Sequence, residues 1–135
     1  MTKSQLIVLT CTINPQIETL VKRSSPKERL RDYKISIDKW ASLSYEVSMD
    51  LLVVENSGYL PELKRQFSST NQKNIMFHSA AIPNVSVDEG ISKGEFLMLR
   101  ESLVDKLDIY QFIWKCSEEI FQLIVIAYFV QKRQT

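Results

Sequence analysis

The chain has 135 residues, of which 44% are hydrophobic and 24% are charged, and its formal net charge at pH 7 is +1. These values are typical of one globular domain with a buried core. The near balance of charges gives no support for a nucleic-acid-binding surface as the main function. The sequence contains neither a stretch of 18 apolar residues, which a membrane-spanning helix needs, nor a signal-peptide pattern at its start.

The first half of the chain alternates between short apolar runs and an amphipathic segment. Residues 5–12 and 50–55 each contain four successive aliphatic residues, which predict strands buried on both faces. Between them, apolar residues recur at helical spacing over about 26–45, with Ser25 as the N-cap and Glu28 completing a capping box. The apolar stripe of this helix consists of Leu30, Tyr33, Ile37, Trp40 and Ala41.

The second half continues the same alternation. A helix over about 60–68, a strand over 74–78, a loop over 80–90, a helix over about 93–107 and a strand over 110–115 are predicted. The stripe of the longer helix consists of Phe96, Leu99, Leu103 and Leu107. This order predicts an α/β fold, a Rossmann-like three-layer αβα arrangement with a mainly parallel sheet, because crossover helices must cover both faces of such a sheet.

The chain divides by composition near residue 116. Residues 1–116 form the predicted domain, and residues 117–135 form an apolar segment with a basic end. Ser117, Glu118 and Glu119 favour a helix start, whereas residues 124–126 would also suit a strand. We expect this segment to pack on the domain or in a homodimer. Contact with a membrane surface and a truncated terminus are the alternatives.

The two cysteines and the only histidine restrict the chemistry. Cys11 and Cys116 lack CxxC spacing and do not match a structural zinc site. We expect both to be small core residues in a reducing compartment, with a disulfide between them left open. No pattern ties His78 to a catalytic triad, so we expect a structural, hydrogen-bonded histidine.

Polar residues follow the first two predicted strands. Thr10, Thr12 and Asn14 end the first, and residues 55–57, with the sequence Glu-Asn-Ser, end the second. Ligands of open α/β sheets bind at the carboxyl ends of the strands, so these residues are candidate site residues. The alternative is that residues 55–57 only close the turn and cap the next helix.

Phosphate-binding loops give a weaker signal. No glycine follows the first strand, which argues against both a dinucleotide-binding and a P-loop function. Gly90, Lys93 and Gly94 precede Glu95 at a predicted helix start, where backbone amides and a lysine can meet a phosphate. A glycine-containing loop that enters a helix is more often structural, and a structural loop is the alternative here.

Four segments, residues 6–15, 28–33, 54–59 and 93–95, resemble motifs of a group of bacterial polysaccharide-synthesis glycosyltransferases with a GT-A-like fold, and they occur in the same order. The resemblance covers roughly residues 5–116. It implies a cytoplasmic domain, at the inner membrane surface in one alternative, with a nucleotide-sugar donor and a saccharide acceptor as ligands. It implies binding roles for Thr10, Thr12, Asn14, Asn56, Ser57, Lys93 and Gly94, and it makes Glu55 and Glu95 the candidate catalytic carboxylates.

Two departures qualify what the resemblance implies. GT-A enzymes commonly hold a divalent metal through an Asp-x-Asp motif, which this sequence lacks. We therefore assign no metal ligand, and Mg²⁺ or Mn²⁺ bound with the nucleotide-sugar is the only cofactor expected. The chain is also short for a donor- and acceptor-binding enzyme. The alternative function is a non-catalytic Rossmann-like interaction module, or a truncated remnant, that uses the apolar C-terminal segment as its partner surface.

Overall fold

A computed structural model describes most of the chain. The described residues are 4–14, 25–67, 74–80, 91–116 and 126–129. The predicted loop beyond Ala80 and the predicted helix start at residues 117–119 lie outside them.

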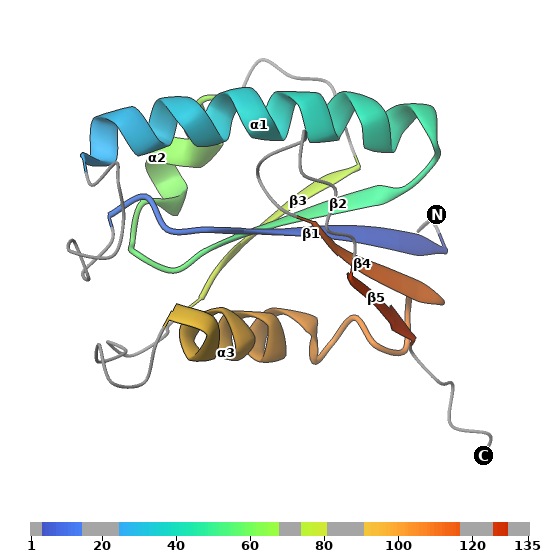
Figure 1. Cartoon of the computed structure of the whole chain (residues 1–135). Helices are drawn as coiled ribbons and strands as arrows, with labels where there is room; N and C mark the ends of the chain where they lie inside the picture. Colours follow the sequence, from blue (N-terminus) through green and yellow to red (C-terminus); the bar gives the residue numbers. More distant parts are fainter. Residues whose placement is uncertain (1–3, 15–24, 68–73, 81–90, 117–125, 130–135) are drawn as a thin grey trace.

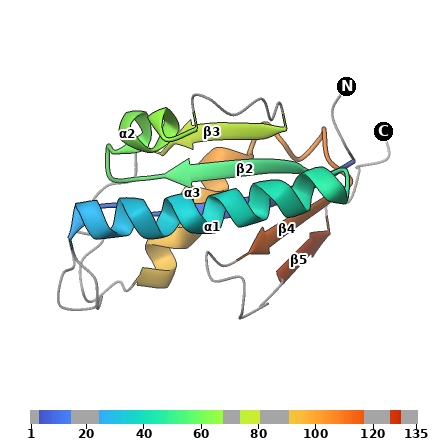
Figure 2. The same cartoon turned by 90° about the horizontal axis from the view of Figure 1, so that it is seen from above.

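Five strands form one sheet in the order β3-β2-β1-β4-β5. They are β1 (Gln5–Cys11), β2 (Asp50–Glu55), β3 (Ile75–Ser79), β4 (Phe112–Cys116) and β5 (Ile126–Phe129). The first four strands are parallel, through the pairs β1–β2, β1–β4 and β2–β3, and β5 pairs antiparallel with β4. Figure 2 shows β2, β3 and β4 pointing in one direction and β5 in the other. The predicted mainly parallel sheet is therefore confirmed.

Three helices cover the two faces of the sheet. α1 (Pro26–Glu46) and α2 (Leu60–Arg65) lie on one face, and α3 (Ile91–Leu103) lies on the other (Figure 1). The predicted three-layer, Rossmann-like arrangement is confirmed. β2 begins and ends at the predicted residues, whereas α2 ends earlier than predicted, at Arg65.

Successive residues of the inner strands point to opposite faces, which explains their unbroken apolar runs. In β1, Ile7 and Leu9 pack in the cluster beneath α1, whereas Leu6 and Val8 pack in the cluster against α3. In β2 every position is buried, so the sequence of this strand shows no polar alternation.

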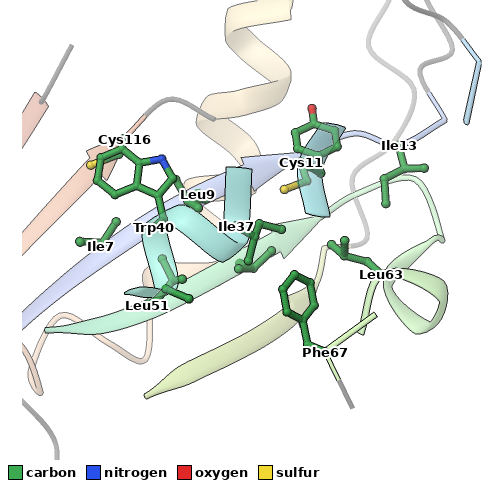
Figure 3. Close-up of a cluster of buried hydrophobic side chains, with 13 residues drawn as sticks. Ile7, Leu9, Cys11, Ile13, Ile37, Trp40, Leu51, Leu63, Phe67 and Cys116 are labelled. Carbon is green, nitrogen blue, oxygen red and sulfur yellow. The ribbon is translucent and has the colours of Figure 1, made fainter. Parts of the chain in front are cut away.

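The core beneath α1 joins α1 and α2 to three strands of the sheet, β1, β2 and β4 (Figure 3). Trp40 of α1 packs in one cluster with Ile7 and Leu9 of β1, and Leu63 of α2 and Phe67, which follows α2, belong to the same cluster. These positions include the apolar stripe predicted for the first helix. Its residues Tyr33, Ile37, Trp40 and Ala41 are buried, and Leu30 packs against the cluster from a partly buried position.

The stripe predicted for α3 is wrong at both ends. Phe96 and Leu107 are exposed, because the helix ends at Leu103 and its buried face is turned toward Met98 and Ser102. Leu99 and Leu103 are buried as predicted. The buried positions still follow helical spacing, but they centre on a different line along the helix than the leucine pattern indicated.

Two other predictions are corrected. Ser25 is the N-cap of α1 and Pro26 follows it, but the Ser25 side chain makes no capping hydrogen bond, so the predicted capping box does not form. Residues 126–129 extend the sheet as β5, because their backbone pairs with β4. Residues 126–129 of the C-terminal segment therefore form a strand, not a helix.

Replacing Trp40 with alanine tests the core beneath α1. Trp40 is buried between α1 and the sheet, so Trp40→Ala should lower the free energy of unfolding by about 3–5 kcal/mol. Tyr45→Ala removes a large aromatic side chain from the same helix at an exposed position and should change stability by less than about 0.5 kcal/mol. Urea titrations followed by circular dichroism measure both, and similar losses in the two variants would contradict this packing.

Candidate functional site

The strand order changes direction between β1 and β4. The chain first adds β2 and β3 on one side of β1 and then crosses by way of α3 to add β4 on the other side. Ligands of open α/β sheets bind at such a switch point, at the carboxyl ends of the strands. We call this edge of the sheet, where β1 to β4 end, the carboxyl edge, and the opposite edge the amino edge.

The carboxylate of Glu55 ties together the loops that follow β1 and β2. Its Oε2 accepts hydrogen bonds from the backbone N–H of Ile13 (2.8 Å) and the hydroxyl of Ser57 (2.5 Å). Its Oε1 accepts from the backbone N–H groups of Ser57 (2.7 Å) and Tyr59 (3.0 Å). The side chain is fully buried, and four donors saturate it. These contacts correspond to the turn-closing alternative and give no support for a catalytic Glu55.

Two further contacts fasten the same loops. The Thr12 hydroxyl donates to Asn56 Oδ1 at 2.7 Å, and the backbone N–H of Asn14 donates to Ser57 Oγ at 2.9 Å. The predicted residues of these two loops are therefore brought together. Because the Asn56 carbonyl oxygen accepts from Thr12, the Asn56 amide nitrogen is the part of this side chain left to donate.

Two side chains of α1 also hold the loop after β1. Arg29 donates from Nε to the carbonyl oxygen of Thr12 at 2.6 Å and from Nη2 to the hydroxyl of Tyr33 at 3.0 Å. That hydroxyl also accepts from the backbone N–H of Thr12 at 3.2 Å. The Arg29 guanidinium lies 5.4 Å from the centroid of the Tyr33 ring. Arg29 and Tyr33 thus fix the loop, although neither was a predicted site residue.

A second polar cluster lies on the α3 side of the switch point. Glu95 Oε1 accepts a hydrogen bond from the Thr10 hydroxyl at 2.8 Å and forms an ion pair with Lys115 Nζ at 2.5 Å. The cluster therefore joins β1, α3 and β4. Thr10 and Glu95 were predicted site residues, and their convergence across 85 residues of sequence is a result of the fold.

Lys115 was missed because it stands inside an apolar strand pattern. The sequence did contain a signal for this residue, because a lysine near the end of a buried strand is unusual and has no simple structural role. Lys93 and Gly94 lie in the first turn of α3, which begins at Ile91, and the side chain of Lys93 is not among those that the structure describes. Their predicted approach to a phosphate remains a prediction.

His78 lies on β3, where it pairs with Val54 of β2. Its Nε2 is 3.0 Å from Glu101 Oε2 of α3, in the structural, hydrogen-bonded role expected for it. The pair links the edge strand to the helix beneath it.

Cys11 and Cys116 are buried, as predicted, and no disulfide joins them. Burial raises the pKa of the Cys116 thiol to about 11, although the neighbouring Lys115 ammonium acts in the opposite direction. The thiol is therefore protonated at neutral pH. Since the thiolate is the nucleophilic form, Cys116 does not supply a nucleophile to the site.

The described residues do not fit a metal site. Within residues 4–14, 25–67, 74–80, 91–116 and 126–129, no group of three His, Cys, Asp or Glu side chains is placed to hold a metal ion. In the described cluster of Thr10, Glu95 and Lys115, the positive charge is that of Lys115.

Comparison with known proteins found no matching family model and no significant match among curated proteins. A search of solved structures found a chain from Desulfovibrio desulfuricans G20, described as a "putative nucleotide-diphospho-sugar transferase", with 14% sequence identity and a TM-score of 0.49. The similarity covers 89% of this chain and 48% of that one, so this chain spans about half the length of that protein. At this identity and TM-score, the likeness assigns no family and transfers no substrate.

None of the helices in the described part of the chain combines the length and the apolar character needed to cross a membrane.

The role of Glu55 predicts a specific stability effect. Glu55→Gln replaces one acceptor oxygen with an NH₂ group that faces backbone or hydroxyl donors, so it should lower the free energy of unfolding by about 1–3 kcal/mol. Glu46→Gln makes the same change at an exposed position at the end of α1 and should cost less than about 0.5 kcal/mol. Equal stabilities of the two variants, measured by urea unfolding, would show that the buried carboxylate does not hold the loops.

The raised pKa of the buried Cys116 thiol predicts slow alkylation. At pH 8, about three units below its pKa, roughly one Cys116 thiol in a thousand is ionised in the native protein. Iodoacetamide labelling followed by mass spectrometry should be slow at pH 8, should accelerate as the pH approaches 11, and should be fast for both cysteines in denaturant. Rapid labelling of native Cys116 at pH 7.5 would contradict its burial.

Proposed function

We propose that this chain is a glycosyltransferase-like domain that binds a nucleotide-sugar donor at the carboxyl edge of its sheet. The observation that supports this function best is the polar cluster of Thr10, Glu95 and Lys115 at the β1–β4 switch point. A cation, a carboxylate and a hydroxyl beside two braced loops suit a ligand with both a diphosphate and polar rings.

In this proposal the loops after β1 and β2 bind the nucleoside. Glu55 and Arg29 hold the loops from inside, so the binding groups are positioned before the ligand arrives. Asn14 is exposed, and the amide nitrogen of Asn56 can donate to a carbonyl of a base. Ser57 supports both loops through its hydroxyl.

The diphosphate would lie on the α3 side of the switch point. Lys93 and Gly94 belong to the first turn of α3, where backbone N–H groups favour anions. Lys115 adds a positive charge from β4. The domain would act by holding the donor and a saccharide acceptor in reactive geometry and by stabilising negative charge on the leaving diphosphate.

The biological setting that we propose is surface or capsular polysaccharide synthesis in the cytoplasm, at the inner membrane surface. This part rests on the resemblance of the four sequence motifs. The rival function is an interaction module that uses the apolar C-terminal segment. Part of that segment pairs with β4 as β5, so the backbone of residues 126–129 already has a partner within the sheet.

Nucleotide titration tests the proposal. UDP, GDP and their sugar conjugates should be added, with and without Mg²⁺ or Mn²⁺, while thermal unfolding is followed. A ligand at 100 times its Kd stabilises the native state by about 2.7 kcal/mol. We expect at least one nucleotide to raise the Tm, and no response to any of them would favour the interaction module.

A variant pair makes this test specific. Asn56→Ala should weaken binding of the responding nucleotide about tenfold, the loss expected for a removed polar contact of about 1.4 kcal/mol. Gln111→Ala, at an exposed position just before β4 and thus at the amino edge, should leave the affinity unchanged. Equal affinities of the two variants would remove Asn56 from the nucleoside site.

A further inference from the structure

We infer that Lys115 is the cation that binds the diphosphate, and that Glu95 is its exchangeable counter-ion, which holds the ammonium group until the diphosphate replaces the carboxylate. This inference rests on the proposed function and deepens it. It gives Glu95 a positioning role in place of the catalytic role predicted from the sequence.

The first support is where the strand register places Lys115. Lys115 of β4 pairs with Val8 of β1, and Thr10 follows two residues later on the same strand face. Val8 and Ile113 pack against α3, so Thr10 and Lys115 are on the α3 side of the sheet. The ammonium therefore lies on the α3 face of the sheet, where it shares Glu95 with Thr10 of the neighbouring strand β1. The switch point between these two strands is where a ligand of this fold is expected.

The second support is the unequal burial of the two charges. The Lys115 side chain is 18% exposed, whereas that of Glu95 is 37% exposed. Leaving the more buried charge without a partner costs more than releasing the more exposed one into water. The lysine is thus the fixed member of the pair, and Glu95 can exchange with another anion.

The third support is chemical complementarity. A phosphate offers more negative charge and more acceptor oxygens than a carboxylate, so it can take over both the Lys115 ammonium and the Thr10 hydroxyl from Glu95. The pairing of Lys115 is then conserved when the ligand binds. Among the described residues no group of three His, Cys, Asp or Glu side chains is placed to hold a metal ion, and Lys115 is the cation that we assign to the diphosphate.

The chain offers matched control residues for both members of the pair. Lys106 has the same side-chain exposure as Lys115, 18%, and also pairs with a carboxylate, that of Asp105. It lies in the turn after α3 that leads toward Tyr110 and the start of β4, at the amino edge. Glu101 lies on α3 like Glu95, with a side-chain exposure of 36%, and its partner is His78.

The experiment measures Kd by calorimetry for uridine and UDP, and for guanosine and GDP, on the full chain in EDTA and in Mg²⁺. Lys115→Met should weaken binding of the diphosphate about tenfold or more and change nucleoside binding less than about twofold. Lys106→Met should change neither, and Lys93→Met tests whether the other candidate lysine carries the charge instead.

The counter-ion role has its own readout. Glu95→Gln should strengthen binding of the diphosphate about threefold or more, because the competing carboxylate is removed, whereas Glu101→Gln should change it less than about twofold. In the Lys115→Met background the gain from Glu95→Gln should disappear, since the two residues act on one contact. A purely structural ion pair would not produce a gain in diphosphate affinity in Glu95→Gln, nor a gain that depends on Lys115.

The outcomes separate the inference from the function that it deepens. Binding of neither nucleoside nor diphosphate to the wild-type chain would overturn both. Normal binding with equal losses for nucleoside and diphosphate in Lys115→Met, or a dominant loss in Lys93→Met, would overturn the inference alone. Weaker diphosphate binding in Glu95→Gln would assign Glu95 to the ligand and would also overturn it, as would diphosphate binding that requires Mg²⁺.

Discussion

The position of β1 at the centre of a parallel sheet is the constraint on which the rest of the structure depends. β1 pairs with β2 on one side and with β4 on the other, in the same direction, so three strands end at one edge. Burial of both faces of β1 requires helices above and below it, which α1 and α3 provide. The loops that leave this edge must diverge, and polar side chains from distant parts of the sequence meet there.

The two sides of this edge are built differently. On the α1 side, Glu55 uses both carboxylate oxygens to hold backbone and hydroxyl donors, and the loops after β1 and β2 are fixed to one another. On the α3 side, the charged groups of Glu95 and Lys115 neutralise one another near the surface. A saturated buried carboxylate organises the backbone, whereas a partly exposed ion pair can exchange its partner for a ligand. In the proposed function, the fixed side would bind the nucleoside and the exchangeable ion pair would meet the diphosphate.

The sequence predicted the elements whose pattern is local. The apolar run of β2 and the helical stripe of α1 determine their own boundaries, because burial on both faces and a 3.6-residue period leave direct traces. The face of α3 was harder, since Phe96 satisfies helical spacing but points to solvent. The β5 strand depends on pairing with β4, which no local pattern of four apolar residues specifies.

The site could be predicted only in part for the same reason. Thr12, Asn14 and residues 55–57 follow apolar runs, so their place at the carboxyl edge could be inferred from the predicted fold. The sequence could not indicate which carboxylate would have all its acceptor positions filled by hydrogen bonds and which would stay near the surface. That difference depends on distances between segments far apart in the sequence. The sequence shows a lysine near the end of a buried strand, but its ion pair with Glu95 becomes visible only when β4 is placed beside β1.

The central claim is that the ligand site lies at the carboxyl edge of the sheet. Its most direct test is a ¹H–¹⁵N correlation spectrum recorded during titration with UDP or GDP. The largest changes in amide chemical shift should fall on residues 10–14, 55–58, 95 and 115–116. The amide signals of the amino edge, from residues 48–50, 74–75 and 110–112, should not move. Shifts concentrated at the amino edge, or a spectrum that no nucleotide changes, would contradict the account.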